Sequence, residues 1–151
     1  MQIHFDSLRA SRRLILKLID PLTIDQLNKI PVGFKNNICW NISHLLVTQQ
    51  LLCYRLSGLE CEISEEFIEK FQKGTAPSYT QNKKEFDQVK DQFLSAIDTL
   101  EKDYYNQKFK SYNNYTTSLN VTLTSIEEGL VFNTFHEGIH LGVILQLLKL
   151  V

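Results

Sequence analysis

Two histidines near the carboxyl end of the chain, His136 and His140, have the spacing of metal ligands. On a helix, residues four apart lie about one turn apart along the axis and about 40° apart around it. Both imidazoles can then reach one metal ion. The residues that share their face are Gly129, Phe132, Val143 and Leu147. This face is mostly apolar, so we expect the two rings to point into the protein interior.

An inward-facing pair of imidazoles has two interpretations. Both rings can be core histidines that hydrogen-bond to the backbone or to water, because leaving them unpaired costs roughly 1–3 kcal/mol each. Alternatively, the two rings share a metal ion. The four-residue spacing on an apolar face favours metal binding for His136 and His140.

A third histidine, His44, lies in another predicted helix, on a face with Trp40, Val47 and Leu51. These neighbours have the character of core residues, so His44 is also expected to point inward. A site of three histidines would leave coordination positions open for water or substrate, as in catalytic metal centres. The alternative is that His44 packs elsewhere in the core. His4, near the amino end, is assigned no role unless it replaces His44 as the third ligand.

Four long segments with helical periodicity must position these histidines. They run from residue 6 or 7 to 19, from 37 to 57, from 81 to 105, and from 124 or 125 to 151. Shorter elements are expected at residues 23–27, at 65–71 and, as a small hairpin, at 112–123. The pattern predicts one all-α domain over residues 1–151, a four-helix bundle. The long connections before the third and fourth long helices predict crossovers rather than simple up-and-down turns.

The composition is that of an ordinary globular domain. With 16 basic and 17 acidic side chains, the chain is not expected to bind nucleic acid through bulk positive charge. No run of about 18 apolar residues occurs, so no membrane partner is expected. The amino end lacks the apolar core of a signal peptide, and Cys39, Cys53 and Cys61 form no regular disulfide pattern. A cytoplasmic protein with reduced cysteines is the expected setting.

The segment HEGIH at residues 136–140 matches the short H-E-x-x-H signature of zinc metalloproteases, with Glu137 as general base. That class of enzyme needs a further ligand, usually downstream. Residues 141–151 contain no His, Asp or Glu, and the chain has no predicted sheet to hold a peptide. A metalloprotease is therefore disfavoured.

The fuller pattern resembles the DinB/YfiT-like superfamily of small metal-binding four-helix proteins. The segments that carry the resemblance are PVGF at residues 31–34, WNISHL at 40–45, TLTSIEE at 122–128 and HEGIHLG at 136–142. Together they cover nearly the whole chain. The resemblance implies that His44, His136 and His140 bind a divalent metal ion such as zinc or nickel.

Some members of this superfamily are thiol-dependent transferases or isomerases that use bacillithiol or mycothiol. The resemblance therefore implies a metal-dependent enzyme that transfers a low-molecular-weight thiol to a small electrophilic molecule. An open metal site fits this chemistry, because it lowers the pKa of a bound thiol or water. Glu137 is a candidate base, and Asn133 is a candidate hydrogen-bond partner for the site. The alternative is a metal-binding or interaction module without catalysis.

Two glycines, Gly138 and Gly142, lie on a second apolar face of the last helix, beside Leu141 and Leu145. A glycine inside a helix costs about 0.8–1.0 kcal/mol relative to alanine. Two of them one turn apart indicate that another backbone approaches closely there. The neighbour is either a helix of the same chain or a second copy, and the family resemblance favours a homodimer.

Aromatic residues alternate with lysine and asparagine over residues 104–115. Such a mixture can stack single-stranded bases. In this nearly neutral chain, we instead expect the segment to cover one end of the bundle and to border the metal cavity.

Overall fold

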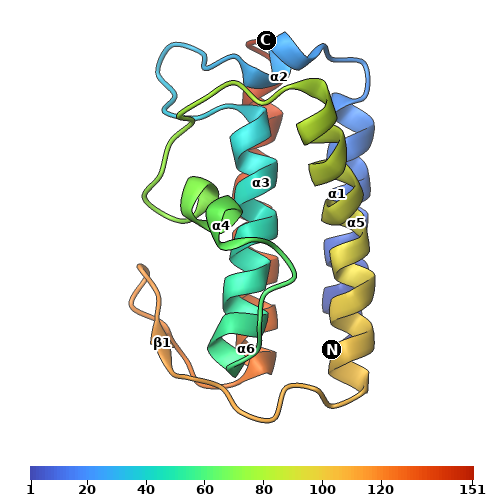
Figure 1. Ribbon diagram of the computed structural model, residues 1–151, viewed down its shortest axis with the longest axis vertical. Coiled ribbons are helices and arrows are strands. Elements are labelled where there is room, and N and C mark those ends of the chain that lie inside the picture. The colour runs from blue at the N-terminus through green and yellow to red at the C-terminus, as the bar shows by residue number, and fades with distance from the viewer.

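The structure, a computed structural model that describes residues 1–151, is built mainly from α-helices, which confirms the predicted all-α class. Four of the helices are long: α1 (Gln2–Ile19), α3 (Ile38–Gln49), α5 (Lys83–Tyr105) and α6 (Ile126–Leu147). They lie side by side along the long axis of the molecule (Figure 1). Helices α1 and α3 each pack against both α5 and α6. None of the helices is long and apolar enough to span a lipid bilayer.

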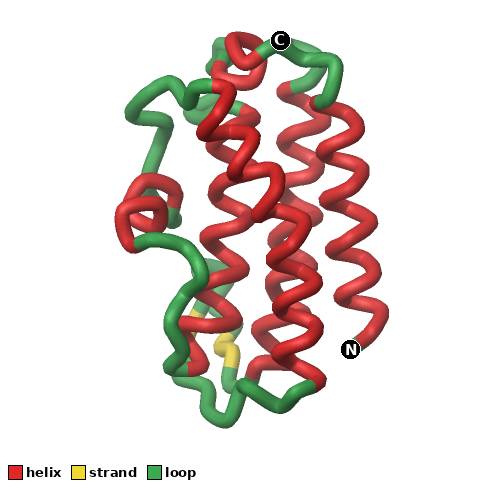
Figure 2. The backbone as a smooth tube through the Cα atoms, turned by 45° about the vertical axis from the view of Figure 1, so that its right-hand side comes forward, coloured by secondary structure: helices red, strands yellow, loops and turns green.

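Shorter elements decorate the long helices. They are α2 (Ile24–Asn28), α4 (Glu65–Phe71) and the two antiparallel strands β1 (Tyr115–Thr116) and β2 (Thr122–Leu123). Figure 2 shows α4 and the strands as separate pieces outside the long helices. The predicted short helix at 65–71 and the predicted hairpin within 112–123 are both confirmed.

Side-chain caps explain where several helices begin. The Thr23 hydroxyl accepts from the backbone N–H of Gln26, and the Gln26 side chain accepts from the backbone of Thr23. The same reciprocal box starts α5 at Asn82, and Ser125 caps α6. Each cap satisfies a backbone donor that has no partner inside the helix. These short-range signals were readable in the sequence, because cap and partner lie within one turn.

Three predicted boundaries were wrong by a few residues. Helix α1 begins at Gln2 rather than at residue 6 or 7, because Phe5 belongs to the buried face of the helix. Helix α5 begins at Lys83, after its Asn82 cap. Helix α6 ends at Leu147 and is followed by a turn instead of continuing to residue 151.

The predicted continuous helix at 37–57 is also corrected. Helix α3 ends at Gln49 and continues as a π-helical turn, Gln50–Tyr54, and a 3-10 turn, Arg55–Ser57. Gln49 and Gln50 are adjacent, yet both side chains are fully buried. The Gln49 amide donates to the Ala96 carbonyl, and the Gln50 amide oxygen accepts from the Glu62 backbone. The wider π turn rotates less per residue, which suits two consecutive side chains that both point inward.

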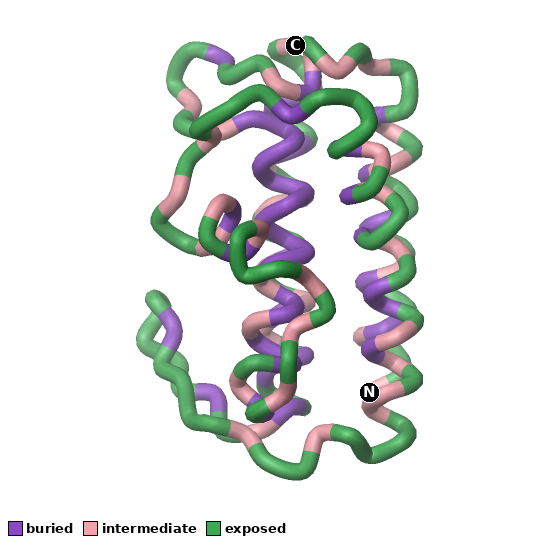
Figure 3. Tube along the Cα trace, viewed as in Figure 1, coloured by how far each residue is buried: buried purple, intermediate pink, exposed green.

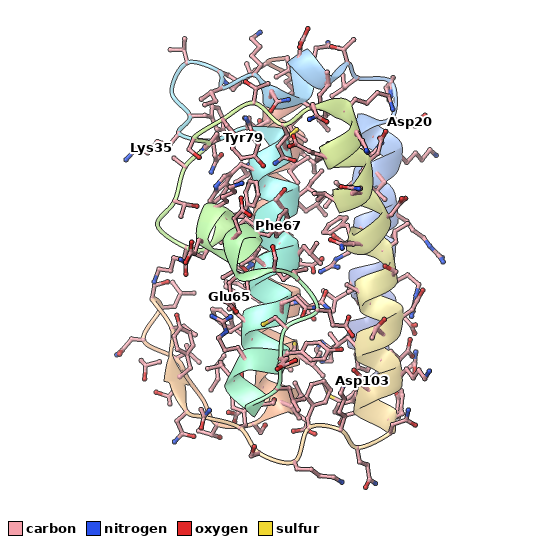
Figure 4. The ribbon with its side chains drawn as sticks, in the orientation of Figure 1. Asp20, Lys35, Glu65, Phe67, Tyr79 and Asp103 are labelled. Carbon is pink, nitrogen blue, oxygen red and sulfur yellow. The ribbon has the colours of Figure 1, made fainter.

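Helix α3 is the most buried element, and residues 38–47 are all buried (Figure 3). On one side it joins the main apolar core with α1, α5 and α6, which includes Ile15, Ile42, Phe93 and Ile144. On the other side it packs against α4, through Trp40, Val47, Ile68 and Phe71. Phe67 of α4 lies at the edge of this second cluster (Figure 4). Because α3 is covered on both sides, its polar residues must find partners inside the protein.

Candidate metal centre

The three predicted histidine ligands lie together. His44 comes from α3, and His136 and His140 come from consecutive turns of α6. One ligand atom from each residue lies within 4.8 Å of the others, so the group could hold a metal ion. The ring centroids are 5.2 Å apart for His44 and His136, 4.8 Å for His44 and His140, and 4.5 Å for His136 and His140. His4 lies outside the group, with its Nδ1 atom 3.2 Å from the Thr134 hydroxyl.

The His44 ring is held from three sides. Its Nδ1 atom lies 2.6 Å from the carbonyl oxygen of Phe71, at the end of α4. A carbonyl can only accept, so Nδ1 carries the proton and Nε2 presents its lone pair. The Thr48 hydroxyl lies 3.3 Å from that Nε2 atom, and the Trp40 indole stacks on the ring at 4.6 Å with an interplanar angle of 9°.

The His140 ring is oriented by an asparagine. Its Nδ1 atom lies 2.7 Å from the side-chain oxygen of Asn41. The Asn41 amide nitrogen donates to the Asn36 side chain at 3.1 Å and to the Asn37 carbonyl at 2.7 Å, which fixes the direction of the amide. The amide oxygen therefore faces His140 and accepts its Nδ1 proton. As in His44, the lone pair of the ring is then on Nε2, an arrangement typical of metal-binding histidines.

The third ring, His136, contains a buried Nδ1 atom without any hydrogen-bond partner. A buried polar atom that lacks a partner costs about 1–3 kcal/mol. Three imidazoles, two of them with an oriented Nε2 and one with an unsatisfied nitrogen, form a donor set that suits zinc or nickel. The residues present therefore fit a divalent metal ion.

Burial keeps the three rings neutral. Loss of hydration lowers the pKa of His44, and it lowers the pKa of His136 to about 4. The pKa of His140 falls to about 3, because burial is reinforced by repulsion from the other two imidazoles. At neutral pH all three rings are in the unprotonated form that a metal requires.

The histidines form part of the wall of a cleft of about 540 Å³. Its lining comes from α3, from the segment that follows α4, from the hairpin and from α6, including Trp40, Thr48, Gln72, Tyr115, Thr117 and Phe132. Arg55 and Lys73 also line it, whereas no carboxylate does. A volume of this size is within the range of small-molecule sites. Tyr115 confirms in part that the aromatic segment borders the cavity.

Glu137 does not line this cleft, although it lies between two of the histidines in sequence. It is 1% exposed and faces the interior, where it is paired with the fully buried Arg12 of α1. The Arg12 Nε atom donates to the two carboxylate oxygens at 3.1 and 3.3 Å, and Nη1 donates to the Phe93 carbonyl at 2.6 Å. Asn133 is also buried, and its amide lies 3.4 Å from Glu137. Thus Asn133 and Glu137 hydrogen-bond within the core rather than to the histidines.

Sequence reasoning missed the two groups that orient the rings, Asn41 and the Phe71 carbonyl. Asn41 carried a signal, because it lies three residues before His44 on a helix whose neighbouring positions are apolar. A buried asparagine in such a segment needs partners. The Phe71 carbonyl had no signal, since any residue type supplies the same backbone oxygen.

The profile of the DinB superfamily matches residues 7–144, a range that includes all three histidines. Among solved structures, the "conserved protein of locus from Enterococcus faecalis" is similar, with a TM-score of 0.67 and 17% identity over 99% of this chain and 95% of that one. At this identity the likeness shows the fold alone. No curated protein matches the chain. The extent of the profile match shows that this chain belongs to the DinB superfamily.

Proposed function

We propose that His44, His136 and His140 bind a divalent metal ion, zinc or nickel, and that the protein is a metal-dependent enzyme. Its reaction would transfer a low-molecular-weight thiol to a small electrophilic molecule, as a thiol S-transferase or isomerase. The observation that carries the proposal is the convergence of three neutral imidazoles, one buried and two partly buried, on the wall of a cleft. A metal bound there would lower the pKa of a bound thiol or water and supply a nucleophile at neutral pH.

The residues of the chain have separate parts in this proposal. The Phe71 carbonyl and the Asn41 side-chain oxygen accept hydrogen bonds from the Nδ1 atoms of His44 and His140. The lone pair of each ring is therefore on Nε2, the atom that would bind the metal. Trp40 and Phe132 provide apolar wall that reduces contact with water. Lys73 brings positive charge to a cleft that no carboxylate lines, which favours a substrate with an anionic group, whereas the charge of Arg55 is balanced by its ion pair with Glu65.

One observation favours the alternative, a metal-binding or interaction module without catalysis. The candidate base Glu137 lies in the core and is paired with Arg12, so it is not available in the cleft. Apart from the histidines, the cleft has no carboxylate or imidazole that could move a proton. The two functions share the metal site and differ in whether thiol is consumed.

Metal content tests the shared part of both functions. We expect protein purified without a histidine tag to contain about one zinc or nickel ion per chain by elemental analysis. His136→Ala and His140→Ala should each lose most of it, because two imidazoles bind far more weakly than three. His4→Ala is the matched control and should keep the wild-type content. Wild-type protein that stays free of metal after incubation with zinc and nickel would overturn the proposal.

A thiol-consumption assay separates the enzyme from the module. Metal-loaded protein is incubated with a panel of low-molecular-weight thiols and electrophiles, and the loss of free thiol is followed with time. The enzyme predicts turnover that disappears in His44→Ala. Bound metal without turnover across the panel would instead support the module.

Further features of the protein are proposed on more general grounds. We infer a four-helix bundle with crossover connections, a homodimer and a cytoplasmic setting, with no nucleic-acid partner. The formal net charge of −1 supports the last point. Sedimentation equilibrium measures the homodimer directly, and a strict monomer at about 100 μM would refute it.

A further inference from the structure

Thr48 directs its hydroxyl group at one of the proposed metal ligands. It lies one turn after His44 on α3, and its Oγ1 atom is 3.3 Å from the Nε2 atom of that ring. The Nδ1 atom of His44 carries the proton, so Nε2 can only accept and the Thr48 hydroxyl is the donor. Among the other polar side chains that line the cleft, none lies within hydrogen-bond distance of a histidine ring.

The orientation of Thr48 differs from that of the other threonines within helices. The hydroxyls of Thr99 and Thr134 donate to the carbonyl oxygen four residues earlier, at 3.2 and 2.9 Å. This is a common partner of a threonine hydroxyl in a helix. Thr48 has the His44 carbonyl at the same relative position, yet its hydroxyl bonds to the ring instead. Its direction is therefore set by the candidate metal centre and not by the backbone of its own helix.

A metal ion at the site would change the partner of this hydroxyl. It would take the Nε2 lone pair of His44 from a distance of about 2.0–2.1 Å. That lone pair is the acceptor of the Thr48 proton, and the hydroxyl donates to no other group. The hydroxyl would then lie beside the ion with a proton to donate. The nearest new acceptor is the atom that completes the coordination, because the histidines supply only nitrogens whose lone pairs are in use.

The wall of the cleft around Thr48 is mainly apolar. Helices α3 and α6 run in opposite directions, so Thr48 and Phe132, each one turn from a histidine, lie toward the same end of the cleft (Figure 1). Leu51 and Leu52 continue this surface along α3. A hydrogen bond is stronger where water competes less for it, and it is strongest when the acceptor carries a charge. These surroundings suit a bound anion such as a thiolate.

We propose that the Thr48 hydroxyl binds the metal-bound sulfur of the substrate thiol, and that this hydrogen bond replaces the one to His44 Nε2. The thiol releases its proton to solvent when it binds, and the hydroxyl stabilises the negative charge left on sulfur. Thr48 is thus a thiol-binding residue, and its ligand is a low-molecular-weight thiolate. This inference rests on the proposed function, since it needs both the metal ion and a thiol substrate.

Thiol binding to cobalt-loaded protein tests the role of Thr48 without turnover. Cobalt in place of zinc gives a thiolate-to-metal absorption band, so a titration with 2-mercaptoethanol measures the thiol affinity. Thr48→Val keeps the shape of the side chain and should weaken this affinity about tenfold, as expected for a hydrogen bond to a charged atom. Thr48→Ser keeps the hydroxyl and should stay within about threefold of the wild type. Thr134→Val is the matched control and should leave the affinity unchanged, because Thr134 is also partly buried within a helix but lies outside the cleft.

Metal affinity, measured by competition with a chelator, separates the outcomes. It should stay within about threefold of the wild type in Thr48→Val, because the hydroxyl has an acceptor both with and without metal. A loss of about tenfold or more would show that Thr48 itself ligates the ion, and would overturn the inference. Equal thiol affinity in the wild type and Thr48→Val, or an equal loss in Thr48→Ser and Thr48→Val, would overturn this inference alone. Wild-type protein that binds no cobalt, or that binds it without a thiolate band, would overturn the proposed function as well.

Discussion

Replacement of Glu137 by glutamine is expected to destabilise the protein strongly. Arg12 is completely buried, and Glu137 is 1% exposed. Glutamine keeps the shape of the side chain but removes the charge that balances the Arg12 guanidinium. Breaking a buried ion pair by neutralising one partner costs about 3–5 kcal/mol, because the other charge stays in the core without compensation. For a chain of this length, that free energy corresponds to a melting temperature lower by roughly 6–20 °C.

Urea denaturation of the metal-free protein measures the effect without a contribution from ligand binding. The matched control is Glu101→Gln. Glu101 pairs with Arg9 at the surface, and both side chains are about one-fifth exposed. That pair is screened by water, so we expect a change in the free energy of unfolding of less than about 1 kcal/mol.

A double variant separates the ion pair from the shape of the core. Arg12→Met with Glu137→Met removes both charges and keeps most of the volume. Its stability should return to within about 1 kcal/mol of the wild type, because two apolar side chains can replace a buried pair without loss. The Phe93 carbonyl loses the Arg12 hydrogen bond in this variant, which limits the recovery.

The reasoning would be refuted by a Glu137→Gln protein that is as stable as Glu101→Gln. A stable Glu137→Gln variant that binds metal but has lost thiol turnover would instead show Glu137 to be the catalytic base. That result would support the hypothesis drawn from its position beside His136. It would also mean that the carboxylate leaves Arg12 during the reaction.

Two further predictions concern the ring orientation and the cysteines. Asn41→Ala should reduce metal affinity by about 10–100-fold in a competition titration, since the His140 Nδ1 proton loses its acceptor; unchanged affinity would contradict this role. Native protein at pH 8 should be alkylated only at Cys61, because burial raises the pKa of Cys39 and of Cys53 to about 12 and leaves almost no thiolate. Mass spectrometry identifies the labelled residue, and labelling of Cys53 as fast as Cys61 would refute the burial argument.

The helices and their caps could be predicted from the sequence because their signals are local. Periodic apolar residues, the Thr23 cap and the spacing of His136 and His140 all act within one or two turns. The same periodicity predicted an unbroken helix through Gln49 and Gln50. The π turn there accompanies hydrogen bonds to Ala96 of α5 and to Glu62 in the segment before α4. Apolar periodicity within one helix contains no information about such distant partners.

The candidate site also combines features that the sequence predicts with features that only the tertiary structure decides. The sequence determined that three histidines lie on inward helix faces, since face and spacing are properties of a single helix. Only the tertiary structure decided that His44 reaches the other two, and that the Phe71 carbonyl, 27 residues away, orients it. It also decided that Glu137 meets Arg12, 125 residues away in sequence, instead of the cleft. Such contacts depend on how helices joined by irregular connections pack together, and no residue encodes that by its type alone.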